Sequence, residues 1–127
     1  MVIPALTKGG YRTRKQVHVG TRPGGGKHVV DAVAGHPSGK TFLISLKWQQ
    51  VSGTAEQKVP FEVLCLAHAI ETDPGKYDGA YLVLGGEGWK LREFYLSGAL
   101  SRYMKGIDAV RIVSLEDFIG RANRQLL

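Results

Sequence analysis

A short connection between two apolar segments constrains the fold of this chain more than any other feature. Residues 27–34 and 41–48 are short and rich in β-branched and aromatic side chains, and residues 35–39, Gly-His-Pro-Ser-Gly, separate them. Segments of this composition are typical of strands, and connections of this length and composition typically join antiparallel strands. The two segments are therefore predicted to form a β-hairpin.

Three more strands are predicted from other short segments. Residues 15–19 alternate between polar and apolar side chains, which is typical of a half-buried strand. Residues 80–84 form an apolar run typical of a buried strand, and residues 109–113 have the composition of a last strand. Glycine-rich segments at residues 20–26 and 85–88 supply turns between these elements.

Helical spacing dominates the region after the third strand. Apolar side chains recur every three or four residues from Val59 onward, which predicts an amphipathic helix with Thr54 or Ser52 as its N-cap. Pro60 predicts either a later start or a kink in this helix. Residues 92–104 are predicted to form a second helix, and Ser114 is expected to cap a terminal one. The order β-β-β-α-β-α-β-α predicts an α/β sandwich with a central mixed sheet flanked by helices.

Length and composition fit a single domain. The chain has 127 residues, of which 43% are hydrophobic, and this is enough for one hydrophobic core. No apolar run approaches the roughly 20 residues that span a bilayer. Cys65 is the single cysteine, so neither an internal disulfide nor a cysteine-based zinc cluster is expected. A cytoplasmic location without membrane contact is predicted.

The positive charge is concentrated in the first third of the chain. The net charge is +6, yet residues 1–47 contain eight Lys or Arg and one acid, whereas residues 48–127 contain nine basic and ten acidic residues. This asymmetry favours a polyanionic partner, because lysine and arginine neutralise phosphate groups. The residues predicted to contact DNA are Lys8, Arg12, Arg14, Lys15, Arg22, Lys27 and Lys40.

Two charged residues interrupt the apolar strands of the predicted hairpin. Asp31 lies in its first strand and Lys47 near the end of its second, where an unpaired buried charge is costly. Ser45, Lys47 and Gln49 are spaced by two residues, so their side chains are expected to share one face. The two charges indicate either a structural cross-strand ion pair or a functional site.

Asp31, then Ser45-x-Lys47 on the adjoining strand, then a helix that carries glutamate, resembles the PD-(D/E)XK nuclease superfamily. This superfamily includes restriction endonucleases and Holliday-junction resolvases. The resemblance covers about residues 16–84 and implies a restriction-endonuclease-like sandwich with an αβββαβ core.

The resemblance also implies an organisation for the single domain of residues 1–127. Residues 1–28 are expected to form a basic, glycine-rich N-terminal part, and residues 29–84 to form the catalytic core.

Ser45 departs from the family pattern, because a second Asp or Glu is usual at this position. A serine hydroxyl is a weak ligand for Mg²⁺, and some restriction enzymes with the same Ser-x-Lys pattern take the missing carboxylate from the following helix. Glu56 and Glu62 are the two candidates. Glu56 is preferred because it shares a helical stripe with Val59, whereas Glu62 has the sequence spacing from Lys47 that better matches the shifted-glutamate enzymes.

The resemblance implies a role for each of these residues. The expected ligands of Mg²⁺, for which Mn²⁺ can substitute, are Asp31, Glu56 (alternatively Glu62) and the backbone carbonyl of Leu46. Lys47 is expected to orient or deprotonate the attacking water, and Gln49 to position water or phosphate. With Ser45, these residues form the expected catalytic set of a DNA endonuclease that leaves a 5′-phosphate and a 3′-hydroxyl.

The resemblance also bears on the substrate and on the oligomeric state. Branched DNA such as a Holliday junction and duplex DNA are both candidate substrates, and residues 1–15 lack the N-terminal acid that known resolvases carry. Cutting two strands favours a homodimer or higher homo-oligomer, and the aromatic segment at residues 89–103 is its expected interface. A prokaryotic, archaeal or phage origin is expected.

Other functional interpretations are weaker or rival. Residues 35–41 resemble a phosphate-binding loop, but only three residues separate the glycines and a strand follows, so no nucleotide cofactor is expected. The four histidines have no partner at metal-binding spacing. A catalytically inactive nucleic-acid-binding module on the same fold, and a basic interaction protein with a structural Asp31–Lys47 pair, remain alternatives.

Overall fold

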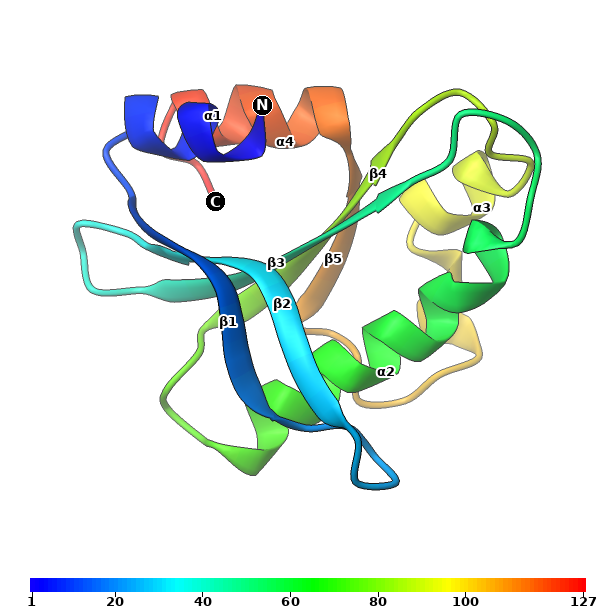
Figure 1. Ribbon diagram of the computed structural model, residues 1–127, viewed down its shortest axis with the longest axis horizontal. Coiled ribbons are helices and arrows are strands. Elements are labelled where there is room, and N and C mark those ends of the chain that lie inside the picture. The colour runs from blue at the N-terminus through cyan, green and yellow to red at the C-terminus, as the bar shows by residue number, and fades with distance from the viewer.

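The computed structural model describes residues 1–127 and contains one five-stranded sheet with helices on both faces (Figure 1). The elements are α1 (Val2–Lys8), β1 (Arg12–Thr21), β2 (Lys27–Gly35), β3 (Thr41–Trp48), α2 (Ala55–Thr72), β4 (Gly79–Gly85), α3 (Arg92–Leu96), the 3-10 helix η1 (Ala99–Arg102), β5 (Val110–Ser114) and α4 (Leu115–Asn123). The strands lie in the order β1-β2-β3-β4-β5; β1, β2 and β3 are antiparallel neighbours, and β4 and β5 run parallel to β3. The predicted mixed α/β sandwich and the β2–β3 hairpin are confirmed.

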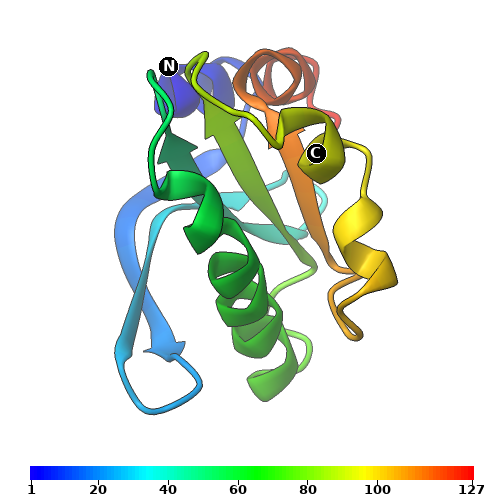
Figure 2. The same cartoon turned by 90° about the vertical axis from the view of Figure 1, so that its right-hand side faces the viewer.

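Two hydrophobic cores lie on opposite faces of the sheet. Helix α2 covers one face, and α1 and α4 lie side by side over the other (Figures 1 and 2). Along β3, Leu43 packs in the core beneath α2, whereas Ile44 and Leu46 pack in the core beneath α1 and α4. Because side chains alternate along a strand, Ser45 and Lys47 face α2.

The β2–β3 ladder ends at the predicted site. Ala32 and Ile44 are the last paired residues, so Asp31 stands just beyond the ladder. Gln16 of β1, opposite Asp31, has a φ of +50°, a conformation that residues with a side chain adopt infrequently. The part of the β1–β2 hairpin nearest its turn bends toward α2 (Figure 1). Val30 in this part packs in the core beneath that helix. The strands therefore separate where Asp31 leaves the sheet.

Helix α2 continues through Pro60, so the predicted later start is not observed. A proline has no N–H, and here the unpaired acceptor is the carbonyl of Glu56, four residues earlier. The buried Tyr95 hydroxyl donates a hydrogen bond of 2.7 Å to that carbonyl. Of the two predicted N-cap residues, Thr54 occupies the position, although its side chain makes no capping hydrogen bond. Neither this helix nor any other combines the length and apolar character needed to cross a bilayer.

Helix α1 was not anticipated from the sequence pattern. It has seven residues and no side-chain N-cap hydrogen bond, so its own sequence specifies it weakly. Leu6 is fully buried in the core it shares with α4. A Cβ atom on Gly9 would lie 1.8 Å from the carbonyl oxygen of Ala122, so the close approach of α1 to α4 requires glycine there.

The single helix predicted for residues 92–104 is wrong. Residues 92–96 form α3, and residues 99–102 form the separate 3-10 helix η1. Gly98 lies between them with a φ of +79°, a left-handed conformation that glycine adopts readily and that ends a helix. The predicted cap of the last helix is confirmed, because the hydroxyl of Ser114 accepts a hydrogen bond from the amide of Asp117.

Candidate active site

Asp31 is fixed where β2 leaves β3. Its side chain is exposed, and its Oδ2 accepts a hydrogen bond of 2.7 Å from the backbone amide of Leu46. A carboxylate therefore takes the place of the backbone acceptor that β2 no longer supplies. The other oxygen, Oδ1, accepts no hydrogen bond from the protein. It is thus available to a ligand.

Glu62 of α2 contacts β3 at Ser45, the residue before Leu46. Its Oε2 accepts a hydrogen bond of 2.7 Å from the hydroxyl of Ser45, and both side chains are buried. Burial raises the pKa of Glu62, but the nearby His28, the hydrogen bond from Ser45 and the charge of Lys47 together bring the net pKa below its ordinary value of 4.5. Glu62 is therefore held as a buried carboxylate at neutral pH.

Lys47 comes directly after Ser45 and Leu46, the β3 residues that hydrogen-bond to Glu62 and Asp31. Its side chain is half-buried and makes no ion pair or hydrogen bond with the protein. The predicted alternative of a structural Asp31–Lys47 ion pair is not observed. The Lys47 ammonium is therefore unpaired, and its charge acts on the carboxylate of Glu62.

The structure brings Glu56 together with a different set of groups. The carboxylate of Glu56 accepts hydrogen bonds from the backbone amide of Lys90 and, over 3.1 Å, from the side-chain amide of Gln49. It therefore joins the first turn of α2 to the segment after β4. Of the two glutamates that the sequence nominates, Glu62 is the one that contacts the Ser45-x-Lys47 strand.

Both the nitrogen and the oxygen of the Gln49 side-chain amide form hydrogen bonds with other groups of the protein. Gln49 is buried, its amide also donates to the carbonyl of Gly88 over 2.7 Å, and its oxygen accepts from the amide of Ala55 over 2.9 Å. The last contact caps the N-terminus of α2 in place of Thr54. Gln49 thus supports the turn that leads from β3 into α2.

The side chains at this position fit a hard divalent cation. Asp31 and Glu62 each retain one oxygen without a hydrogen bond from the protein, and Mg²⁺ typically binds one or two carboxylates together with water and substrate phosphate. No group of three or more His, Cys, Asp and Glu side chains forms a cluster suited to a metal ion.

His28 is a buried neighbour of Glu62 that the spacing of the histidines did not reveal. It is 1% exposed, and its Nε2 lies 3.5 Å from Glu62 Oε2. The signal present in the sequence was a histidine among β-branched residues of a predicted strand, three residues before Asp31. That pattern does not specify which element the side chain meets.

The basic residues of the first third are distributed over both faces of the sheet. Arg14 pairs with Val33, which lies in the core beneath α2, whereas Lys15 pairs with Ala32 of the other core. Directly opposed residues of antiparallel strands share a face. Arg12 and Arg14 line an open hollow of about 800 Å³ together with the β2–β3 turn. The other predicted contacts lie on α1, at the β1–β2 turn and before β3: Lys8, Arg22, Lys27 and Lys40.

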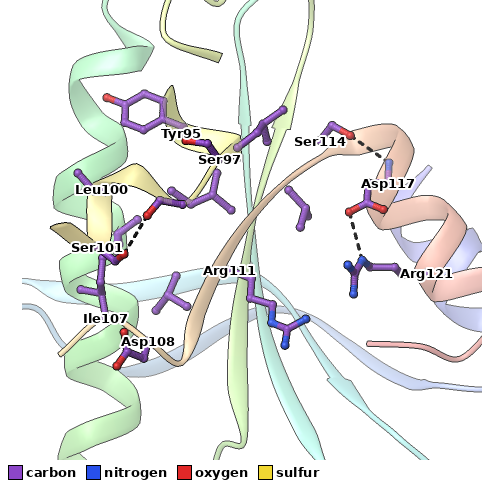
Figure 3. A pocket seen from close by; sticks show the side chains of 16 residues that line it. Tyr95, Ser97, Leu100, Ser101, Ile107, Asp108, Arg111, Ser114, Asp117 and Arg121 are labelled. Carbon is purple, nitrogen blue, oxygen red and sulfur yellow. Dashed lines mark hydrogen bonds and ion pairs between the residues drawn. The ribbon is translucent and has the colours of Figure 1, made fainter. Parts of the chain in front are cut away.

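A second hollow, of about 520 Å³, lies beside the edge strand β5 (Figure 3). Its lining side chains come mainly from α3, η1, β5 and α4, and they include none of the catalytic, metal-binding or DNA-binding residues nominated from the sequence. Asp117 and Arg121 point toward each other there and form an ion pair of 3.1 Å (Figure 3). The acid–lysine arrangement described above is thus a separate feature of the molecule.

Comparisons with known proteins identify the family and a similar fold. A family model described as the PD-(D/E)XK nuclease superfamily domain matches residues 1–126. The fold is similar to a crystal structure described as that of a protein of unknown function, AF1548, with a TM-score of 0.55 and 14% sequence identity over 90% of this chain. The match covers 54% of that protein, so this chain spans about half its length. No curated protein matches.

Proposed function

Because the chain belongs to the PD-(D/E)XK nuclease superfamily, we propose that it is a metal-dependent endonuclease that hydrolyses phosphodiester bonds in DNA. One observation carries the proposal: Asp31 and Glu62 are anchored at Leu46 and Ser45, immediately before Lys47 on the same strand. Two carboxylates and an unpaired ammonium at one strand end are suited to binding a cation and a phosphate together.

Each residue has a defined part in the proposed reaction. Asp31 and Glu62 would hold Mg²⁺ or Mn²⁺, with the Leu46 carbonyl as a further oxygen ligand. When bound, the cation would supply charge neutralisation and a lowered pKa for water. Lys47 orients that water and stabilises the negative charge that develops on the phosphate. The products are a 5′-phosphate and a 3′-hydroxyl. Glu56 and Gln49 support the turn before α2 and leave the ligand role to Glu62.

The basic N-terminal part of the chain is proposed to bind the DNA backbone. Arg12 and Arg14 line one hollow at the sheet edge, and Arg22 and Lys27 flank the glycine-rich β1–β2 turn. Phosphate contacts of this kind hold a duplex without reading its sequence. Residues 1–28 thus carry most of the DNA contacts and residues 29–84 the catalytic groups, and either branched or duplex DNA fits this arrangement.

A homodimer or higher homo-oligomer is proposed because cutting both strands favours an assembly with two sites. Within residues 89–103, Trp89 and Tyr95 are buried in the protein's own core, whereas Tyr103 is 74% exposed and stacks on the partly exposed Phe94. The contact between subunits is therefore proposed to involve Phe94 and Tyr103 rather than the whole aromatic segment. Sedimentation equilibrium of the wild type and of Tyr103→Ser tests this assembly.

The cleavage reaction is tested with supercoiled plasmid, linear duplex and a four-way junction. Each substrate is incubated with Mg²⁺, Mn²⁺ or EDTA and with wild type, Lys47→Ala or Lys105→Ala. Lys105 is an exposed lysine outside the proposed site and serves as the matched control. Cutting in Mg²⁺ or Mn²⁺ but not in EDTA, abolished by Lys47→Ala and retained by Lys105→Ala, is the expected result.

The same assay distinguishes the substrates and the alternative function. Preferential cutting of the four-way junction identifies a junction-specific enzyme, and equal cutting of linear duplex identifies a duplex nuclease. Tight binding of DNA without cutting in either metal contradicts the proposed catalysis and supports an inactive nucleic-acid-binding module.

A further inference from the structure

His28 is a buried polar side chain that the proposed reaction leaves without a role. It lies on β2 and is 1% exposed, and neither of its ring nitrogens has a hydrogen-bond partner at ordinary distance. Buried polar groups almost always have such a partner. A residue that served only to fill the core would be apolar at this position, since an apolar ring leaves no nitrogen unsatisfied.

The contacts of Glu62 show what the ring nitrogen can do. Nε2 of His28 lies 3.5 Å from Oε2 of Glu62, and this same oxygen accepts the hydroxyl hydrogen of Ser45 over 2.7 Å. His28 and Ser45 come from adjacent strands, β2 and β3, and the carboxylate comes from α2. Both contacts are made to one oxygen, so Oε1 is left without a hydrogen bond from the protein.

We propose that His28 is a positioning residue for Glu62. Its Nε2–H donates to Oε2, and together with the Ser45 hydroxyl it fixes the rotation of the carboxylate so that Oε1 is presented to a divalent cation. The inference rests on the proposed function, in which Glu62 is a metal ligand. Hydrogen bonds from neighbouring groups are a general means of orienting metal-binding side chains.

The proposal requires a particular tautomer of His28. A neutral imidazole carries its proton on one nitrogen and accepts at the other, so the proton must lie on Nε2. Long-range ¹H–¹⁵N correlation spectra of the wild-type protein without metal report this directly. We expect the Nε2-protonated form, with a slowly exchanging Nε2–H. A proton on Nδ1 alone overturns the proposal, whether or not the protein cuts DNA.

Two substitutions separate hydrogen bonding from packing. His28→Phe keeps an aromatic ring but removes both nitrogens, and His28→Gln keeps an N–H near the position of Nε2. His18→Phe changes an exposed histidine on β1 and is the matched control. Circular dichroism melting first establishes that each variant is folded, and calorimetry then measures Mn²⁺ binding in the absence of DNA.

The expected order of Mn²⁺ affinities identifies the role. We expect His28→Phe to bind Mn²⁺ about 10- to 100-fold more weakly than the wild type, with most of the affinity recovered in His28→Gln and no change in His18→Phe. Wild-type affinity in His28→Phe, or equal weakness in His28→Gln and His28→Phe, overturns the positioning role alone. If the wild type binds no Mn²⁺ and cuts no DNA, the proposed function fails, and the positioning role fails with it even where the Nε2–H is observed.

Discussion

The hydroxyl of Ser45 donates a hydrogen bond of 2.7 Å to Oε2 of Glu62, which lies 17 residues further along the chain. A serine in the place of an acid would otherwise leave the site with Asp31 as its one carboxylate near β3. Here the serine contacts a carboxylate supplied by α2. The departure of Ser45 from the family pattern and the position of Glu62 are thus two aspects of one arrangement.

Removal of the Ser45 hydroxyl is expected to weaken catalysis without unfolding the protein. In Ser45→Ala, Glu62 loses a hydrogen bond, and the carboxylate is less well oriented. We expect cleavage at limiting Mg²⁺ to slow by about 10- to 100-fold. Ser45→Thr retains a hydroxyl and is the control, expected to keep most of the activity. Equal activity of Ser45→Ala and wild type across a Mg²⁺ titration contradicts the assignment.

Substitutions of the two glutamates of α2 are expected to have different effects, one mainly on cleavage and the other mainly on the free energy of unfolding. Glu62→Ala removes a proposed ligand and should reduce cleavage by about 100-fold or more. Glu56→Ala leaves the amide of Lys90 and the side chain of Gln49 without their shared acceptor, and should lower the free energy of unfolding by about 1–3 kcal/mol. Urea denaturation and plasmid cleavage, run on both variants, measure the two effects. Loss of cleavage in folded Glu56→Ala with full cleavage in Glu62→Ala would reverse the assignment.

Helix α2 accommodates Pro60 with the help of the hydrogen bond from the Tyr95 hydroxyl to the Glu56 carbonyl. Tyr95→Phe removes the hydroxyl that donates to the Glu56 carbonyl and leaves a buried acceptor unpaired. We expect the free energy of unfolding to fall by about 1–3 kcal/mol. Tyr103→Phe is the matched control, because the Tyr103 ring is largely exposed. Chemical denaturation followed by fluorescence compares the two, and equal effects on stability would show that the Tyr95 hydrogen bond contributes little.

The ionisation of Glu62 is expected to make stability depend on pH. Burial raises its pKa, but His28, Ser45 and Lys47 outweigh burial and place the folded-state pKa below the ordinary 4.5. The carboxylate therefore contributes stability above about pH 4.5, and this contribution is lost as pH falls through the lower folded-state value. Urea denaturation in EDTA between pH 7 and pH 3 should show a steeper loss for the wild type than for Glu62→Gln. Parallel curves would contradict the sign of the shift.

The strand pattern predicted most of the fold, because alternation and short glycine-rich turns are local properties of the sequence. The hairpin that carries Asp31 and Lys47 was found in this way. Helix α1 was missed since its seven residues gain stability from packing on α4 and not from a cap or a periodic stripe. The break at Gly98 was missed because glycine is also tolerated within helices.

The choice between Glu56 and Glu62 depended on contacts that no local pattern contains. Helical phase placed Glu56 in the core-facing stripe, and the structure does bury it. Its partners, however, are Gln49 and Lys90, and Lys90 follows β4, more than 30 residues away. His28 was likewise unassigned, because its neighbour Glu62 lies on another element. Long-range packing therefore decided which side chains meet.

The two oxygens of the Asp31 carboxylate have separate parts, one in the fold and the other in the proposed reaction. Oδ2 completes the hydrogen bonding of Leu46 where the β2–β3 ladder ends, and Oδ1 remains open to solvent and ligands. An asparagine in this place would still present one acceptor to the Leu46 amide. The architecture of the strand junction thus requires an oxygen, whereas the proposed reaction requires a negative charge. A single amide-for-acid replacement would extinguish cleavage while the sheet that displays the site stays whole.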